Sequence, residues 1–141
     1  MQKAFFQSIE TSSCETRFPL DTFLDNLTFN EQGLIPVITQ QHDTGQVLMM
    51  AWMNSEAIQK TLSSGKMTYW SRSRQAFWVK GETSGNTQTL KTMRIDCDGD
   101  ALLCLVDQQG GGACHALRSN CFYFDVDAAS ASVVVNESQP S

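Results

Sequence analysis

The chain has 141 residues, 41% of them hydrophobic, and this composition predicts one globular domain with a single modest core. Fifteen acidic residues against ten basic ones give a net charge of −5, which argues against a general binder of nucleic acids or anionic membranes. No apolar run approaches the ~20 residues that cross a bilayer, and no signal peptide is evident, so we expect a cytoplasmic protein. Five cysteines in that setting predict metal ligation or burial rather than disulfides.

The first half of the chain predicts an extension, a hairpin and a helix. Residues 1–33 show no steady periodicity and are interpreted as an N-terminal extension with one short helix near residues 21–27. Two β-rich segments, 34–39 and 46–52, flank turn residues and predict a hairpin. Asn54 can cap a helix that Gly65 ends, so we expect the principal helix over residues 54–64.

The second half predicts strands. The β-rich segments are 67–70, 76–80, 87–95, 100–106 and 121–126. Asp98-Gly99 supplies a tight turn between two of them. Residues 34–126 are then the folded domain, and 127–141 are interpreted as a flexible C-terminal tail. The expected architecture is a single α+β domain, mostly antiparallel β with one principal helix.

Three thiols fall within the densest cluster of metal-ligating residue types, at Cys97, Cys114 and Cys121. Catalytic zinc sites commonly use three protein ligands and keep a fourth position open, so three thiolates favour an open site. Because Cys97 lies at a predicted hairpin tip, a site shared between two copies of the chain is one arrangement. Core cysteines, or a closed site completed by His115, are the alternatives that the spacing leaves open.

Three carboxylates, those of Asp96, Asp98 and Asp100, surround Cys97. In extended geometry they would share one side of the strand, where a hard cation such as Mg²⁺ or Ca²⁺ would neutralise them. An EF-hand loop is excluded because Ala101 occupies the position that requires glycine. The remaining alternative is a solvated turn of acids.

Two segments combine cations with hydroxyl groups and glycine, the features that bind phosphate oxygens. Their residues are Ser71, Arg72, Ser73 and Arg74 in the first segment and Lys80, Thr83, Ser84 and Gly85 in the second. Trp70 and Trp78 lie nearby and either stack on a base or belong to the core.

Taken together, five ordered motifs over about residues 34–125 resemble the phosphoribosyl-AMP cyclohydrolase family of histidine biosynthesis. The segments that carry the resemblance are 48–54, 69–74, 78–85, 96–100 and the pair 113–115 with 121–123. The resemblance implies hydrolytic opening of the adenine ring of 1-(5-phosphoribosyl)-AMP between N1 and C6, giving the formimino-aminoimidazole carboxamide ribotide.

The resemblance also implies an intertwined homodimer with one zinc ion per subunit. Zinc would be held by Cys97 of one subunit and by Cys114 and Cys121 of the other, and Mg²⁺ by the three aspartates. We assign His115 as the proton shuttle and the two hydroxyl-rich basic segments as the substrate-binding residues. We expect a stand-alone enzyme, since only about fifteen residues follow the last predicted strand and leave no room for a pyrophosphatase domain.

The sequence departs from the usual family pattern at three places. Asn86 stands where the family usually has histidine, Ala116-Leu117 replaces a Thr-Gly pair, and three glycines, 110–112, replace a shorter Gly-Pro. These departures keep open an alternative function, that of a diverged, non-catalytic metal-binding dimer of the same fold.

Overall fold

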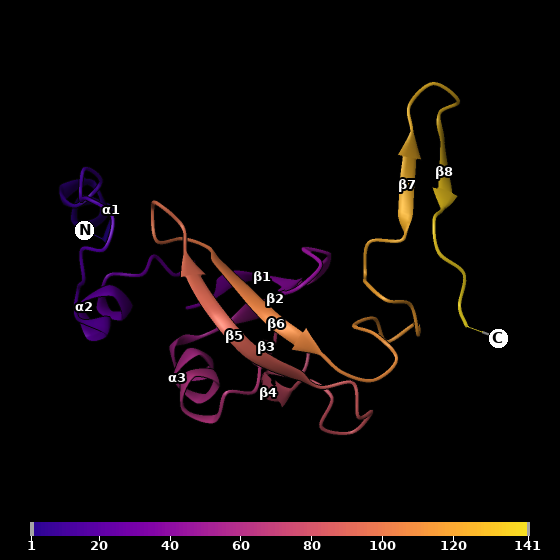
Figure 1. Cartoon of the computed structure of the whole chain (residues 1–141), viewed down its shortest axis with the longest axis horizontal. Coiled ribbons are helices and arrows are strands. Elements are labelled where there is room, and N and C mark those ends of the chain that lie inside the picture. Colours follow the sequence, from indigo (N-terminus) through magenta and orange to yellow (C-terminus); the bar gives the residue numbers. More distant parts are fainter. Residues whose placement is uncertain (1, 141) are drawn as a thin grey trace.

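A four-stranded sheet forms the centre of the computed structural model, which describes residues 2–140 (Figure 1). Its strands lie in the order β2-β1-β6-β5 and comprise β1 (Ile35–Gln41), β2 (Val47–Met53), β5 (Gln88–Ile95) and β6 (Leu102–Gln108). β1 pairs antiparallel with β2, and β6 pairs antiparallel with β5. The two hairpins are joined by a parallel pairing of β1 with β6. The α+β class with mostly antiparallel strands is thus confirmed.

One face of this sheet is the core. Along β1, Ile35, Val37 and Thr39 are fully buried, whereas Ile38 between them is 41% exposed, the alternation expected of a sheet that buries one face. The buried face packs against helix α3 (Ser55–Ser64) and the neighbouring strand β3.

Helix α3 confirms the principal helix predicted from its end signals. The Asn54 side chain caps it by accepting a hydrogen bond from the Ala57 backbone nitrogen at 2.8 Å. Gly65 ends it in the left-handed conformation, with φ of 76°. On the buried face, the Thr61 hydroxyl accepts from the Thr68 backbone nitrogen at 3.0 Å and so joins the helix to β3.

Strands β3 (Thr68–Ser71) and β4 (Ala76–Val79) form a separate antiparallel hairpin beside the main sheet. Cross-strand aromatic pairs stabilise it: the rings of Tyr69 and Trp78 are 4.9 Å apart, and those of Trp70 and Phe77 are 5.0 Å apart. Its turn carries Ser71 to Arg74, so this hairpin positions the first predicted phosphate-binding segment.

Two short helices precede the sheet, α1 (Gln2–Ser8) and α2 (Leu20–Asp25), where the sequence predicted one. Phe6 and Phe23 contact edge to face, with ring centroids 5.5 Å apart. Phe6 also packs on Gly99, where an added Cβ would overlap its ring. The N-terminal segment therefore covers the β5–β6 turn. No helix between residues 2 and 140 is long and apolar enough to span a membrane.

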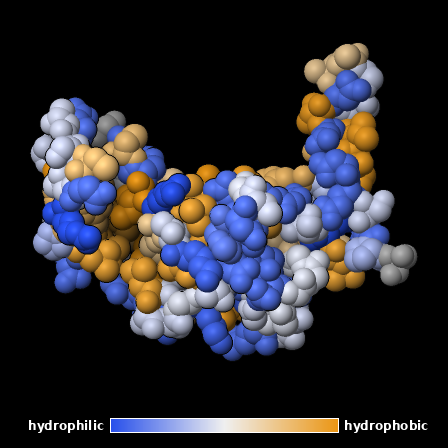
Figure 2. Space-filling model, in the orientation of Figure 1, coloured by the Kyte–Doolittle hydropathy of each residue, from blue (hydrophilic) through white to orange (hydrophobic). Residues whose placement is uncertain are grey.

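The C-terminal hairpin consists of β7 (Phe124–Asp127) and β8 (Ser132–Val135) and projects away from the sheet (Figure 1). All eight residues are exposed, although five of them are valine or phenylalanine. Figure 2 shows these apolar side chains on the projecting arm. The sequence predicted a flexible tail from residue 127, and the structure instead forms a second strand there.

Candidate functional site

Cys114 and Cys121 lie together at one end of the sheet. The six residues between them fold into a tight loop, which is closed by a hydrogen bond from the Ala113 nitrogen to the Ser119 carbonyl at 3.1 Å. The Cys121 nitrogen donates to the Leu48 carbonyl at 2.7 Å and so fixes the loop to β2. Burial, together with the charge of the Cys114 thiol and the hydrogen bond to it, raises the pKa of the Cys121 thiol to about 11. Cys121 therefore holds its proton more tightly than an ordinary thiol does.

Lys80 is a cation close enough to this thiol pair to interact with its charge. Its Nζ donates to the Ala113 carbonyl at 2.6 Å and lies 5.8 Å from the Trp78 ring centroid. Burial lowers the pKa of Lys80, and the charges of Cys121 and Cys114 oppose that shift. Lys80, predicted to bind phosphate, thus also lies close enough to the two sulfurs to interact with them electrostatically.

Cys97 lies at the opposite end of the sheet, exposed in the turn between β5 and β6. The seven residues of β6 separate this turn from the Cys114 loop, a span of roughly 20 Å at ~3.3 Å per residue. Among residues 2–140, no group of three or more His, Cys, Asp or Glu side chains is placed to hold a metal ion. One chain therefore brings two of the three predicted thiols together, not three.

The three aspartates lie in and beside the tight turn that was predicted at Asp98-Gly99. Asp96 Oδ1 accepts from the backbone nitrogens of Asp100 and Ala101, at 2.8 and 3.3 Å. A side-chain hydrogen bond that Asp100 donates to Asp96, together with burial and the neighbouring negative charges, raises the pKa of Asp100. At Asp96, burial acts to raise the pKa, but hydrogen bonds from the Asp100 side chain and from backbone nitrogens outweigh it and lower the pKa. The extended geometry in which the carboxylates would share one side of a strand is not formed, because Gly99, with φ of 70°, reverses the chain here.

All of the predicted substrate-binding residues except Gly85 line hollows along the β3–β4 hairpin, and three of these hollows share lining residues with a neighbour. The central one, about 630 Å³, is bordered by Ser71, Arg72 and Ser73 together with three tryptophans, Trp52, Trp70 and Trp78. A neighbouring hollow of about 280 Å³ shares Trp78 and is lined by Arg74, Lys80, Thr83 and Ser84. The Arg72 guanidinium lies 4.8 Å from the Trp52 ring centroid. The structure thus gathers both basic segments along one hairpin.

Two of the predicted residues are placed differently. Gly85 does not line these hollows, and its backbone nitrogen donates to the Gly81 carbonyl at 2.8 Å within the turn after β4. His115 follows Cys114 directly and is exposed. It is therefore open to solvent beside the thiol pair.

Sequence reasoning missed a buried chain of hydrogen bonds behind the thiol loop. The Tyr69 hydroxyl donates to Gln88 Oε1 at 2.6 Å, and Gln88 Nε2 donates to Gln108 Oε1 at 2.8 Å. Gln108 Nε2 then donates to the Asn86 carbonyl at 3.0 Å. Isolated glutamines and a tyrosine in strands carry no sequence signal of such a network.

The sequence model of the phosphoribosyl-AMP cyclohydrolase family matches residues 49–123. A protein of that name from Alcanivorax borkumensis is 63% identical over 105 residues, 74% of this chain and 73% of the relative. Another, from Rhodospirillum centenum, is 54% identical over 122 residues, 86% of this chain and 91% of the relative. The chain belongs to the phosphoribosyl-AMP cyclohydrolase family.

The stretch matched to this hydrolase family contains the thiol pair, Lys80 and the β3–β4 hairpin. Two departures from the usual phosphoribosyl-AMP cyclohydrolase pattern contact each other. Asn86 Oδ1 accepts a hydrogen bond from the Gly111 nitrogen at 2.7 Å, and a Cβ at Gly110 would overlap this same oxygen. Asn86 and the extra glycines therefore act together to hold the loop that leads to Cys114.

Proposed function

We propose that the chain catalyses the zinc-dependent hydrolysis of 1-(5-phosphoribosyl)-AMP, opening the adenine ring between N1 and C6 in a step of histidine biosynthesis. The observation that carries this proposal is the Cys114–Cys121 thiol pair beside Lys80, within the stretch that the family model matches. Thiols can ligate zinc only when reduced, which suits a cytoplasmic setting.

The two paired thiols fit a zinc ion as ligands. They already face each other closely enough to share a hydrogen bond, and zinc would replace the proton between them. We propose Cys97 of a second copy as the third ligand, because the Cys97 of the same chain lies at the far end of β6. When bound, zinc supplies a water of lowered pKa as the nucleophile near neutral pH.

An intertwined homodimer would also cover apolar surface. The exposed hairpin β7–β8 and the outer face of the sheet, with Ile38 and Met50 41% and 43% exposed, are apolar areas that a second copy would bury. The homodimer and the shared zinc site are therefore one proposal, because both require the same arrangement of two subunits.

The chain's own residues would hold the substrate and move protons. Arg72, with Ser71, Ser73 and Arg74, would bind phosphate at the β3–β4 turn, and the three tryptophans of the central hollow would contact the adenine. Thr83 and Ser84 would donate hydrogen bonds near Lys80, as would the backbone around Gly85. His115, exposed beside Cys114, would carry the proton to the departing N1.

Magnesium at Asp96, Asp98 and Asp100 is a weaker proposal. Within the described chain these carboxylates do not form a metal-holding group, and Asp96 is already occupied by backbone nitrogens. A cation there would displace the hydrogen bond between Asp96 and Asp100. We assign no step of the reaction to it.

The test is turnover of phosphoribosyl-AMP by the purified protein, followed by the absorbance of the ring-opened product. We expect activity that a chelator abolishes and zinc restores. Cys97→Ser should lose zinc and activity together, and His115→Ala should alter the pH–rate profile while zinc stays bound. Zinc binding without any turnover would instead favour the diverged, non-catalytic metal-binding dimer.

A further inference from the structure

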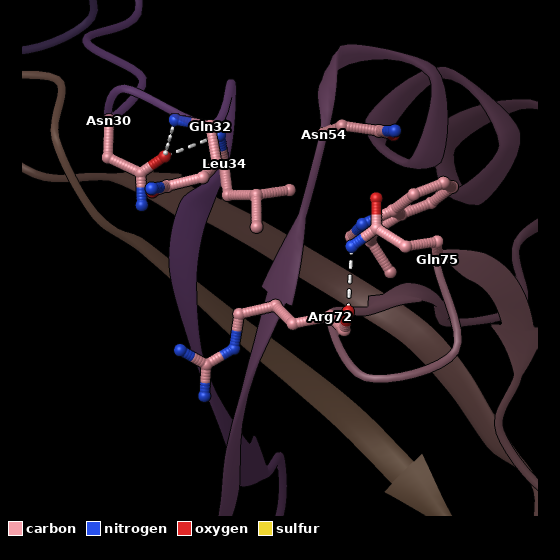
Figure 3. A pocket seen from close by; sticks show the side chains of 7 residues that line it. Asn30, Gln32, Leu34, Asn54, Arg72 and Gln75 are labelled. Atoms are coloured by element: carbon pink, nitrogen blue, oxygen red, sulfur yellow. Dashed lines mark hydrogen bonds between the residues drawn. The ribbon is translucent and has the colours of Figure 1, made fainter.

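A third hollow, of about 390 Å³, adjoins the central one, and its amide side chains have no role in the function proposed so far. We call it the amide pocket because four of its seven lining residues carry carboxamides. The lining residues are Asn30, Gln32, Leu34, Asn54, Trp70, Arg72 and Gln75. Figure 3 shows Asn30, Gln32 and Leu34 on one side of the pocket and Asn54 and Gln75 on the other, with Arg72 extending below them.

Hydrogen bonds to the backbone fix which group each amide presents. Asn30 Oδ1 accepts from the backbone nitrogens of Gln32 and Leu34, at 2.9 and 3.0 Å. Asn54 Oδ1 accepts from the Ala57 nitrogen that begins helix α3. The Nδ2 groups of both asparagines bond to no described residue, so both remain available as donors.

Gln75 presents the complementary group. Its Nε2 donates to the Arg72 carbonyl at 2.7 Å, which leaves Oε1 as an acceptor. The pocket thus combines two fixed donors and one fixed acceptor, a set suited to hydroxyl groups, which both donate and accept.

Arg72 gives the pocket its charge. No acidic residue lines the amide pocket or the central hollow, so the guanidinium has no carboxylate neighbour there. A cation–π contact, with the guanidinium carbon 4.8 Å from the Trp52 ring centroid, restrains the position of the guanidinium. A fixed guanidinium without an acidic partner is a binding group for phosphate.

The position of the pocket connects it to the rest of the site. It shares Trp70 and Arg72 with the central hollow, which shares Trp78 with the hollow that contains Lys80. These shared residues place the three hollows next to one another along the β3–β4 hairpin.

We propose that the amide pocket binds a ribose 5-phosphate group of the substrate, with Arg72 on the phosphate and the carboxamides on the sugar hydroxyls. The identity of the substrate rests on the proposed function, but the sugar-phosphate chemistry rests on the pocket itself. Adenine in 1-(5-phosphoribosyl)-AMP carries ribose 5-phosphate on both N9 and N1. One of these arms occupies the amide pocket while the base lies among the tryptophans.

The decisive variant is Asn54→Asp. Aspartate caps a helix as well as asparagine does, so α3 and the free energy of unfolding should not suffer. The donor facing the pocket becomes a negative oxygen, however, which repels phosphate and pairs with Arg72. We expect ribose 5-phosphate, titrated at millimolar concentration and followed by NMR, to bind about tenfold more weakly or worse. KM for phosphoribosyl-AMP should rise by a similar factor, with a smaller change in kcat.

Gln59→Glu is the matched control, because it adds the same charge to an exposed position of the same helix outside the pocket. It should leave ribose 5-phosphate binding and KM unchanged. Asn30→Asp is the second variant, since it keeps the acceptor for Gln32 and Leu34 and removes only the donor.

Two results would overturn the proposal: no binding of ribose 5-phosphate by the unmodified protein, or unchanged binding in both aspartate variants. A protein that binds ribose 5-phosphate in the expected manner but fails to turn over phosphoribosyl-AMP would refute the proposed function and leave the pocket assignment standing.

Discussion

The central sheet and the C-terminal hairpin are both rich in valine, but the sheet buries these side chains and the hairpin exposes them. In the sheet, Val37 and Val106 are fully buried against helix α3 and β3. In the hairpin, Val126 is 81% exposed and its partner Val133 is 60% exposed. Sequence pattern therefore accounts for strand formation in both regions, but only the sheet finds its packing partner within the chain.

This difference identifies what the single chain leaves incomplete. A two-stranded hairpin alone is marginal in water, because nothing covers its side chains. Burying one such side chain stabilises a structure by roughly 1.5–3 kcal/mol. The hairpin begins three residues after Cys121, so covering it with a second copy would also hold the proposed zinc ligand in place.

Truncation of a sheet residue should have the largest effect on stability. Ile35 is fully buried, and Ile35→Ala should lower the free energy of unfolding by about 2–5 kcal/mol through lost contacts and a residual cavity. Val126→Ala should change it by less than about 0.5 kcal/mol at low protein concentration. Urea unfolding of both variants measures the contrast. Similar losses in the two would show that the hairpin is packed within the chain after all.

Polar substitution of the hairpin should act on assembly instead. Val126 and Val133 lie opposite each other, and replacing both with serine should weaken a dimer by about tenfold or more. Sedimentation over a range of concentrations gives the dissociation constant, and Ala129→Ser in the hairpin turn is the control for added polarity. If the double variant dimerises like the unmodified chain, the hairpin is not part of the subunit interface.

The loop between the two regions should show the next effect, a pH dependence of zinc binding. Because burial and Cys114 raise the pKa of Cys121 to about 11, this thiol is protonated at neutral pH and must lose its proton when zinc binds. The apparent affinity for zinc should therefore rise with pH, by about tenfold per pH unit for each proton released.

Competition with a chromophoric chelator between about pH 6 and 8 measures that slope. Cys121→Ser should bind zinc more weakly and flatten the slope by about one proton. A slope that is the same with and without Cys121 would remove this thiol from the ligand set.

Local signals explain how much of the fold the sequence could predict. Asn54 and Gly65 define helix α3 by chemistry that acts within a few residues, and the turn at Gly99 was evident for the same reason. The parallel pairing of β1 with β6 joins residues more than sixty positions apart and leaves no local signature. Strand β8 was missed although Val133 to Val135 are strong β formers, because no core pattern accompanied them.

In the candidate site, too, contacts between residues close in sequence could be predicted and contacts between distant residues could not. The seven-residue spacing of Cys114 and Cys121 is short enough for one loop to bring them together, and the structure does so. Whether Cys97 joins them depends on a second copy, which the sequence of one chain cannot orient. Asn30 and Gln75 are loop residues with no distinctive sequence pattern, and only the structure shows that they line the same pocket as Arg72.

The smallest effect we predict concerns backbone strain in the thiol loop. Leu117 has φ of 66°, a left-handed conformation that costs a residue with a Cβ roughly 1–2 kcal/mol. Its side chain is 54% exposed, so little packing is lost on removal. Leu117→Gly should therefore stabilise the chain, by no more than about 1 kcal/mol because glycine gains entropy in the unfolded state.

Leu117→Ala is the control that separates the two causes. Alanine removes the same exposed side chain but keeps the Cβ, so the backbone strain stays and thermal unfolding should show no gain. An equal gain from both variants would assign the effect to the exposed side chain. A loss in zinc-dependent dimerisation from both would instead mean that Leu117 contacts the second copy, which would extend the interface from the hairpin to the thiol loop.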